Sequence, residues 1–364
     1  MKKLFLVAAA AVFALSANAK VWRINYDENA NADFRTITAA CSSAKVANSD
    51  TLYCEAGSHA GSEGDNVISR KGLKVFGPGW GFEPQYGSTS TIADARFNAH
   101  VKIQANDVVI SGIVCSRDLQ LDQNISKNVT IKRCKLNELY RYQNDTLLNL
   151  TVTNCEIGRI YLYNGYSKQM KNIYITNNII RQENANRAVE ITAQDNQYFS
   201  NVNILRNTIV SRCYTSYSIL NVNNALIQDN ILINISNSTY LMDFSTDRGN
   251  IIRKNVMSLP DGAVETAEIV TNYPDNYYAS ATEASTFTCA NSTYAHEQYY
   301  QLKDGSPAKG KAYDGGDCGA FGGSTPYIIG GRPQGIPYIT DVEVPAQPKD
   351  NKLTVTFKVA NQNE

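Results

Sequence analysis

The sequence predicts an all-β fold, a parallel β-helix of about eight or more stacked coils. Three observations lead to this prediction. A nine-residue pattern recurs along the middle of the 364-residue chain. Within each copy, apolar residues alternate with polar ones, which is typical of a strand with one buried face. Successive copies start 21 to 29 residues apart, the length of one solenoid coil, at Asp107, Asn128, Asn149, Asn172, Asn201, Asn224 and Gly249.

Residues 1–19 match a secretory signal peptide. A basic start at Lys2 and Lys3 precedes an apolar run, and Ala17-Asn18-Ala19 has the small-x-small pattern of a cleavage site. The apolar run is too short to span a bilayer, and no other stretch is long enough. We therefore expect an exported protein without a membrane span, located in the periplasm, on the cell surface or outside the cell.

Residues 20–325 are assigned to the β-helix together with a cap at its N-terminal end. A helix near residues 33–44 is expected to cover the first coil, with Asp33 or Asn31 as its N-cap. Its apolar side chains fall on one helical face: Phe34, Ile37, Cys41 and Ala44. A strand is expected directly afterwards, at residues 51–54.

The repeated pattern also predicts a bend inside each coil. The second and fourth positions are apolar, as in Val129 and Ile131, and the seventh and ninth face inward again, as in Cys134 and Leu136. A regular strand cannot change parity in this way, so the chain must bend at the fifth and sixth positions. Asn suits such a bend, because it tolerates the left-handed region and can bond its own backbone.

Asparagine makes up about a tenth of the chain, and the repeat explains this excess. The seventh position is Asn in four consecutive copies: Asn178, Asn207, Asn230 and Asn255. Stacked on coils about 4.8 Å apart, these side chains would form a ladder in which each amide both donates and accepts.

Residues 326–364 are predicted to form a C-terminal extension with strands that cap the last coil. Residues 353–359 alternate cleanly between apolar and polar side chains, which indicates one such strand. A glycine-rich stretch from Gly305 to Gly323 ends the coils.

The chain has eight cysteines, and export permits disulfides. Three pairings fit their positions: Cys41 with Cys54, Cys134 with Cys155, and Cys289 with Cys318. The alternative is that these cysteines are small buried thiols. With three histidines and no Cys/His spacing of the zinc type, we expect no metal and no cofactor.

Charge bears on the class of partner. Lys and Arg number 34, as do Asp and Glu, so the formal net charge is zero. A nucleic-acid-binding protein would show a basic excess, so nucleic acid is not an expected partner. A monomer is expected.

Two groups of residues are candidates for a functional site. Arg206, Asp229 and Lys254 occupy the sixth position of consecutive copies, on an outward bend. They would form either a site that binds or eliminates uronate sugars or a surface ladder of ion pairs. Glu190 and Asp243 are further candidates, because they should lie on the third strands of later coils.

The second group is aromatic. Tyr140 and Tyr161 lie one coil apart, as do Tyr142 and Tyr163. If these tyrosines face outward, they form a platform on which sugar rings can stack. If they face inward, they belong to the core. Arg141 favours the outside for its own side chain, which would turn the tyrosines inward. Ile160 and Leu162 favour the inside, which would turn the tyrosines outward, so the pattern leaves both orientations open.

The two ends of the β-helix carry a resemblance. Residues 32–57, with Asp33-Phe34 and Asp50-Thr51-Leu52, and residues 306–323, with Asp317-Cys318-Gly319, resemble secreted right-handed parallel β-helix repeat proteins of Bacteroidota, within the pectin-lyase-like superfamily. The resemblance covers nearly all of residues 20–364. It implies a right-handed coil and a link to polysaccharides, since the superfamily includes lyases, hydrolases, esterases and non-catalytic adhesins.

No complete catalytic motif of that superfamily is found in the sequence. The Gly-His-Gly of polygalacturonase-type hydrolases is absent, and Arg187 stands where a pectin methylesterase has Gln. The sequence therefore predicts a secreted protein that binds an extracellular polysaccharide or cell-surface glycan. Cleavage by a lyase or hydrolase mechanism is the less favoured form of this hypothesis, and a non-catalytic adhesin or structural scaffold is the alternative.

Overall fold

The computed structural model describes most of the chain from Ala19 to Glu343, and parts of the C-terminal extension. The described residues are 19–343 without 60, 63, 65, 81–93, 123–125, 144–145, 165–168, 183–187, 194–198, 212–218, 235–241, 243–247, 259–269, 280–281, 289–299 and 332–337, and in addition 347, 352 and 354–360. Residues 1–18 of the expected signal peptide, Asp243, Cys213 and Cys289 lie outside this set.

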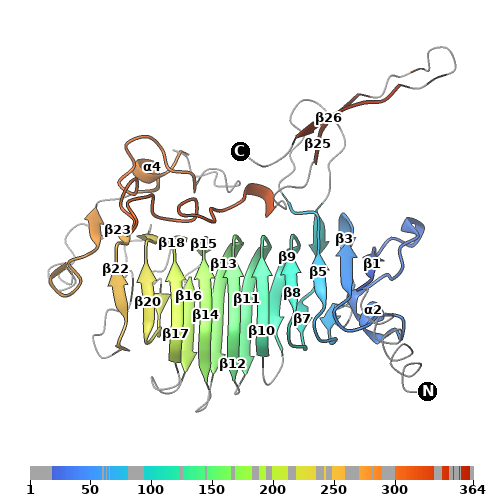
Figure 1. Cartoon of the computed structure of the whole chain (residues 1–364), viewed down its shortest axis with the longest axis horizontal. Helices are drawn as coiled ribbons and strands as arrows, with labels where there is room; N and C mark the ends of the chain where they lie inside the picture. The colour runs from blue at the N-terminus through green and yellow to red at the C-terminus, as the bar shows by residue number, and fades with distance from the viewer. Residues whose placement is uncertain are drawn as a thin grey trace, which may run out of the picture.

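The described residues confirm an all-β parallel β-helix, whose coils stack side by side along one axis (Figure 1). Ten strands form the first parallel sheet, in the order β1 (Val21–Ile24), β2 (Thr51–Cys54), β5 (Lys74–Phe76), β8 (Val109–Ser111), β10 (Ser126–Lys132), β12 (Leu147–Thr153), β14 (Met170–Thr176), β17 (Phe199–Leu205), β20 (Ala225–Gln228) and β22 (Ile251–Arg253).

Among the residues that the structure describes, the second parallel sheet has 14 strands. Its main path is β3 (Gly57–His59), β6 (Ala95–Phe97), β9 (Val114–Leu121), β11 (Lys135–Gln143), β13 (Glu156–Asn164), β15 (Ile179–Gln182), β18 (Thr208–Ser211), β21 (Ile231–Asn234), β23 (Val256–Ser258) and β24 (Tyr277–Ala279). Four more strands pair beside this path: β4 (Val67–Ile68), β7 (Val101–Ile103), β16 (Val189–Ala193) and β19 (Ile219–Leu220).

Strand register confirms the coil lengths expected from the repeat. Thr130 pairs with Val109 on one side and with Thr151 on the other. Thr151 pairs in turn with Tyr174, and Tyr174 with Asn203. The copies recognised in the sequence are therefore neighbouring strands of the first sheet.

The predicted bend is formed by residues in the left-handed region. The sixth position of six copies has φ between 51° and 59°: Arg133, Asn154, Asn177, Arg206, Asp229 and Lys254. Asn and Asp tolerate this conformation, whereas Arg and Lys are less suited to it. The first position also adopts positive φ, for example 56° at Asn149 and Asn172, so each of these six copies contains two such corners.

The buried asparagine ladder is present and extends one coil further than predicted. In a typical member, Asn207 Oδ1 accepts from the backbone N and the Nδ2 of Asn178, both at 3.0 Å. Its Nδ2 donates to Asn230 Oδ1 at 3.1 Å and to the carbonyl of Ile175 at 2.8 Å. Asn255 continues this pattern to Asn276, where Nδ2 donates to Oδ1 at 2.9 Å. Each buried amide is thereby paired, as burial requires.

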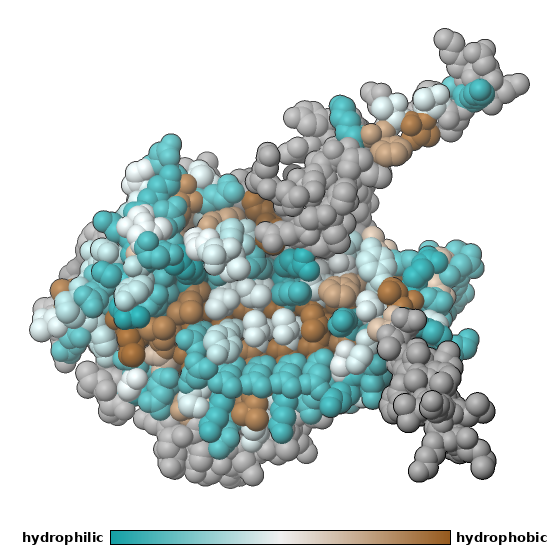
Figure 2. Space-filling model, in the orientation of Figure 1, coloured by the Kyte–Doolittle hydropathy of each residue, from teal (hydrophilic) through white to brown (hydrophobic). Residues whose placement is uncertain are grey.

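A second asparagine ladder lies on the surface. At the first position, Nδ2 of Asn149, Asn172 and Asn201 each donates to Oδ1 of the preceding copy, at 2.6, 2.7 and 2.8 Å. Each ladder takes one asparagine from every coil that it joins, always at its own position of the repeat. On the face shown in Figure 2, hydrophilic side chains form a row across the coils, next to a band of hydrophobic surface.

The N-terminal cap is shorter than predicted. Helix α2 spans Ile37–Ser42, and its N-cap is Thr36, whose side chain accepts from the backbone N of Ala39 at 3.1 Å. Asp33 is not the cap, because its carboxylate accepts from the backbone N of Arg23 at 2.8 Å. Asn31 ends the 3-10 turn η1 (Glu28–Ala30) instead. Buried Ile37, Ala40 and Cys41 face the first coil, as expected for a cap.

The predicted C-terminal strand exists, but its partner is not the last coil. Strand β26 (Thr356–Ala360) pairs antiparallel with β25 (Tyr338–Glu343), and in the described part of the chain the two strands form a separate sheet. Figure 1 shows this hairpin extending away from the coils. The short helix α4 (Glu283–Thr286) and the 3-10 turn η5 (Ile329–Gly331) complete the elements. No helix among the described residues is long and apolar enough to cross a membrane.

The cysteines of the described residues are free thiols, which corrects two proposed pairings directly: Cys41 with Cys54, and Cys134 with Cys155. Cys134 and Cys155 occupy equal positions on neighbouring coils, so their side chains run parallel, whereas a disulfide needs converging Cβ atoms. Cys318 is also free, and its proposed partner Cys289 lies outside the described residues. Burial raises the pKa of Cys54 and Cys115, and that of Cys318 to about 12.

These thiols should be unreactive in the folded protein. At pH 8, a chromogenic disulfide reagent is expected to label the six described cysteines only after denaturation, because burial makes them inaccessible to the reagent. Peptide mapping of the alkylated, non-reduced protein provides the check. Recovery of a peptide pair joined through Cys134 and Cys155 would contradict the parallel orientation of these side chains.

The buried asparagine ladder should contribute more to the free energy of unfolding than the exposed one. Asn207→Leu leaves the amide and backbone N of Asn178 without their acceptor, so the free energy of unfolding should fall by about 3 kcal/mol. Asn149→Gly keeps the left-handed corner and removes only solvent-exposed bonds, so its cost should stay below about 1 kcal/mol. Urea denaturation of both variants measures the difference, and equal costs would show that burial does not set the strength of the ladder.

Candidate functional site

The C-terminal segment, defined here as Tyr300–Gly331, runs back along the coils from the last strands toward the first (Figure 1). It is attached at successive sixth positions. Cys318 Sγ donates to the carbonyl of Lys254 at 3.3 Å, and the Gly319 N–H donates to that of Asp229 at 2.8 Å. At the far end, the Trp80 N–H donates to the carbonyl of Gly330 at 2.7 Å.

Between these ends, the asparagine corners of two coils also hold the segment. Asn177 Nδ2 donates to the carbonyls of Ala320 and Gly322, at 3.0 and 2.9 Å, and Asn154 Nδ2 donates to that of Thr325 at 3.4 Å. Apolar packing adds to these bonds. A second buried cluster joins the second sheet to the segment. It includes the outward residues Ile179, Ile231 and Val256 of the sheet, and Ala308, Ala320 and Tyr327 of the segment.

Arg206 and Asp229 lie beneath this segment. Arg206 Nη2 is 3.2 Å from Asp229 Oδ2 and 2.8 Å from Asp314 Oδ2, and Nη1 donates to the carbonyl of Asp317. Asp229 Oδ1 accepts from the Tyr313 N–H at 2.7 Å, and its side chain is 2% exposed. The sequence interpretation treated this column as open surface. The structure corrects that, because the column anchors the chain's own C-terminal segment.

Lys254 completes the column at the margin of the same contact. Its ammonium lies 5.5 Å from the centre of the Tyr277 ring, and its carbonyl accepts the Cys318 thiol. Sequence reasoning placed these three residues in one column, but it could not foresee a covering segment more than fifty residues away along the chain.

The orientation of the tyrosines, which the sequence left open, is outward. Leu139, Ile160 and Leu162 are fully buried on the inner side of the second sheet. Tyr142 is 55% exposed. Arg141 was expected to prefer the outside, yet it is also fully buried, where its Nη1 donates to the carbonyl of Tyr163 at 3.2 Å.

The four tyrosines form one stacked platform, referred to below as the tyrosine platform. Ring centres of Tyr140 and Tyr161 are 5.5 Å apart, and those of Tyr142 and Tyr163 are 4.6 Å apart with an interplanar angle of 9°. Along β13, Tyr161 and Tyr163 are 6.4 Å apart and nearly parallel. Such rings present apolar faces to one side and hydroxyl groups at their ends, which suits a ligand with both apolar and polar surfaces.

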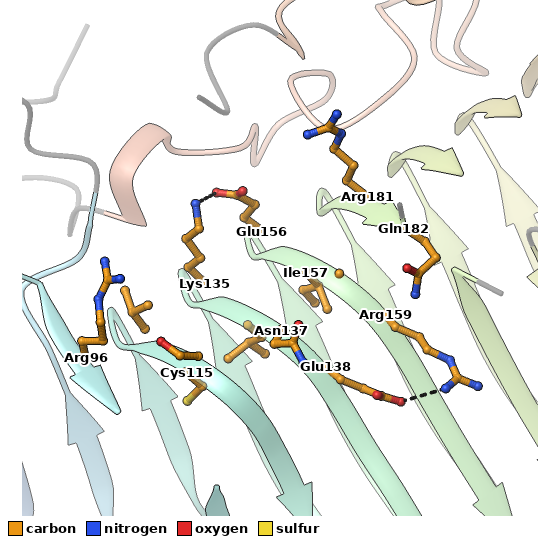
Figure 3. Close-up of a pocket in the computed structure, with 14 residues that line it drawn as sticks. Arg96, Cys115, Lys135, Asn137, Glu138, Glu156, Ile157, Arg159, Arg181 and Gln182 are labelled. Carbon is orange, nitrogen blue, oxygen red and sulfur yellow. Dashed lines mark ion pairs between the residues drawn. The ribbon is translucent and has the colours of Figure 1, made fainter. Parts of the chain in front are cut away.

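A charged cleft of about 440 Å³ lies on the same sheet, between β9, β11, β13 and β15 and below the C-terminal segment (Figure 3). Lys135 and Glu156 pair across it with Nζ and Oε2 3.1 Å apart. Arg96 and Arg181 extend from either side toward the covering segment (Figure 3). Lys135 and Glu156 are also register partners on β11 and β13.

Arg159 joins the cleft to the tyrosine platform. Its Nη1 is 3.3 Å from Glu138 Oε1, its Nη2 donates to Glu190 Oε2 at 3.2 Å, and its guanidinium lies 4.5 Å from the centre of the Tyr161 ring. Glu190, a sequence candidate, is therefore part of this site. Burial raises the pKa of Glu138; Arg159 opposes this effect, and the nearby Asp118 and Glu190 carboxylates add to it.

Sequence reasoning missed Asp118 and His100. Asp118 lies opposite Glu138 on the neighbouring strand β9, and its Oδ2 is 3.3 Å from His100 Nδ1. The signal in the sequence is hidden by a shift of register. Leu136 pairs with Cys115, 21 residues earlier, but Glu138 pairs with Asp118, only 20 residues earlier. A search at constant coil spacing therefore aligns Glu138 with the wrong residue.

Among the residues that the structure describes, no group of three or more His, Cys, Asp or Glu side chains is arranged to hold a metal ion. No protein-family model matches the chain, and no curated protein matches it. The site is therefore interpreted from its own geometry.

The anchor of the C-terminal segment gives a test. Arg206→Met removes the ion pairs to Asp229 and Asp314 and leaves Asp229 buried without its cation, which should lower the free energy of unfolding by about 3 kcal/mol. Amide hydrogen exchange within residues 308–325 should accelerate. Arg35→Met, which removes an exposed ion pair to Glu28, serves as the control, with a cost below about 1 kcal/mol. Unchanged exchange in Arg206→Met would show that the column does not hold the segment.

Proposed function

We propose that the protein binds an extracellular polysaccharide along the outward face of the second sheet. The tyrosine platform is the observation that carries this proposal. Four rings on two adjacent coils present parallel faces, and sugar rings stack on aromatic faces of this kind. A sugar-stacking role for these tyrosines was predicted from their 21-residue spacing, and their outward orientation supports it.

The surroundings of the platform also support a ligand that is longer than one sugar. The charged cleft continues from the platform along β11 and β13, through Glu138 and Arg159 to Lys135 and Glu156. Hydrogen-bonding groups therefore follow the aromatic faces in one direction. A chain of sugars can stack on the rings and place its hydroxyl groups against these side chains, as polar groups fix orientation in ligand sites.

Export by the N-terminal signal is part of the same proposal, since it brings the protein to polymers outside the cytoplasm. The resemblance to secreted β-helix proteins of Bacteroidota also supports export. A scaffold or adhesin without a glycan ligand is the alternative, and the binding experiment separates the two.

Removal of rings from the tyrosine platform should weaken glycan binding. Tyr142→Ala and Tyr163→Ala should each lower affinity by about two- to tenfold, because one stacking contact of about 0.5–1.5 kcal/mol is lost. A glycan array identifies the ligand, and titration calorimetry with that glycan measures the affinities.

Tyr53→Ala is the matched control. Tyr53 is an exposed tyrosine of the first sheet, on β2, so its loss should leave the affinity unchanged. Equal affinities for wild type, Tyr142→Ala and Tyr163→Ala would remove the platform from the binding site. An absence of binding to every glycan on the array would favour the scaffold.

A further inference from the structure

The C-terminal segment has two parts that differ in how they are attached to the coils. The first part, residues 317–322, is bonded to the corners of consecutive coils, at Lys254, Asp229, Arg206 and Asn177. The Ala320 N–H adds a bond of 3.0 Å to Thr208 Oγ1. Cys318 and Ala320 are buried. This part of the segment is therefore fixed to the coils.

The second part, residues 323–329, crosses the next coils with less support. Residues 323–325 are exposed. The carbonyl of Thr325 accepts from Asn154 Nδ2 at 3.4 Å, which is long for a hydrogen bond of this kind. Gly323 has a φ of 80°, a conformation that glycine adopts readily. A stretch with exposed residues and weak bonds opens at a lower free energy than its surroundings, so a hinge is expected at Gly323.

A latch holds the far end of this stretch, where Gly330 and Gly331 meet Gly79 and Trp80. The Trp80 N–H donates to the carbonyl of Gly330 at 2.7 Å, and Trp80 is 3% exposed. A Cβ atom on Gly331 would lie 2.0 Å from Trp80 Cζ3, and one on Gly79 would lie 2.4 Å from the Gly330 carbonyl oxygen. The latch therefore closes only because glycines allow the two backbones to approach.

The stretch between hinge and latch bridges the charged cleft. One row of register partners crosses β9, β11, β13 and β15 at this point: Val114, Lys135, Glu156 and Ile179. The two outer residues of the row belong to the buried cluster that also contains Trp80 and Tyr327. The two inner residues pair across the cleft, and Figure 3 shows the segment passing above this pair. A ligand that follows β11 and β13 from the tyrosine platform therefore meets the segment where both strands begin.

We propose that residues 323–331 form a strap, hinged at Gly323 and released at Trp80, whose opening admits long polysaccharide chains to the cleft. With the strap closed, a chain on the tyrosine platform ends at Lys135 and Glu156. A short oligosaccharide fits this space, whereas the interior of a polymer enters only after the strap lifts. The admission of polymers rests on the proposed function, because the platform must hold the ligand; the opening of the strap does not.

The strap gives the two kinds of ligand different thermodynamic effects. A ligand shifts a conformational equilibrium only by its difference in affinity for the two states. A polymer that continues past the cleft binds the open state alone, so it shifts the population toward that state. A short oligosaccharide binds both states and leaves their populations unchanged.

Amide hydrogen exchange tests the strap without a ligand. In the wild type, residues 323–329 should exchange at least about tenfold faster than residues 317–322. Gly331→Ala should accelerate the strap further and leave residues 317–322 unchanged, because the new Cβ displaces the Trp80 ring. Gly305→Ala is the matched control. Gly305 also has a positive φ, of 75°, but no described atom lies within 4 Å of an added Cβ, so exchange of the strap should stay unchanged.

The fluorescence of Trp80 reports the latch directly. The chain has two tryptophans, so Trp22→Phe leaves Trp80 as the single indole. Acrylamide should quench its emission weakly, because Trp80 is 3% exposed. Adding Gly331→Ala should make quenching clearly stronger, and adding Gly305→Ala should not change it.

Association kinetics test the admission of polymers, with the glycan that the array identifies. The observed rate for the polymer should level off at high concentration, because binding must wait for the strap to open. Gly331→Ala should raise this limiting rate by about tenfold or more. The association rate of a short oligosaccharide of the same glycan should be equal in both proteins.

The results separate this inference from the proposed function. Equal exchange of residues 323–329 and 317–322 in the wild type, or equal acceleration of both in Gly331→Ala, would overturn the strap. Faster exchange in Gly331→Ala with unchanged polymer association would overturn its role in admission and leave the proposed function intact. If no glycan binds, the proposed function and the admission of polymers fail together, and exchange and quenching alone decide whether the strap opens.

Discussion

The stacking of equal positions on neighbouring coils is the constraint on which the rest of the structure depends. Parallel strands repeat at about 4.8 Å, so any side chain recurs next to its counterpart. A buried amide can satisfy this repeat indefinitely, because its oxygen faces one neighbour while its nitrogen faces the other. The ladder from Asn178 to Asn276 does so, and each member also bonds to the backbone. Corners in the left-handed region then fix where each coil turns.

The same repetition creates a surface that must be divided between packing and function. In one column of the second sheet, Lys135 and Glu156 are followed by Ile179, Thr208, Ile231 and Val256. The apolar part of the column is covered by the C-terminal segment, and the charged part lines the cleft. The position of the candidate site therefore follows from where the column changes from apolar to charged residues.

Electrostatics at the candidate site depends on one arginine that serves two carboxylates. Arg159 stacks on Tyr161 and pairs with both Glu138 and Glu190. Because the carboxylates outnumber their cation, burial and mutual repulsion raise the pKa of Glu138. The chain is neutral as a whole, yet its charges are distributed unevenly.

The sequence by itself determined the coil period, the inward face, the bends and the ladder, because each is a local pattern that recurs at coil spacing. It also identified the two tyrosine columns, Tyr140 with Tyr161 and Tyr142 with Tyr163. Only the tertiary structure decided the outward orientation of the tyrosines. The sequence left it open because a charged residue, Arg141, occupies the same face of the strands as the apolar residues, and Arg141 is in fact buried. It also decided the covering of Arg206 and Asp229, and the approach of Asp118 to Glu138. These features depend on a long-range contact and on a one-residue shift of register, and neither leaves a regular spacing in the sequence.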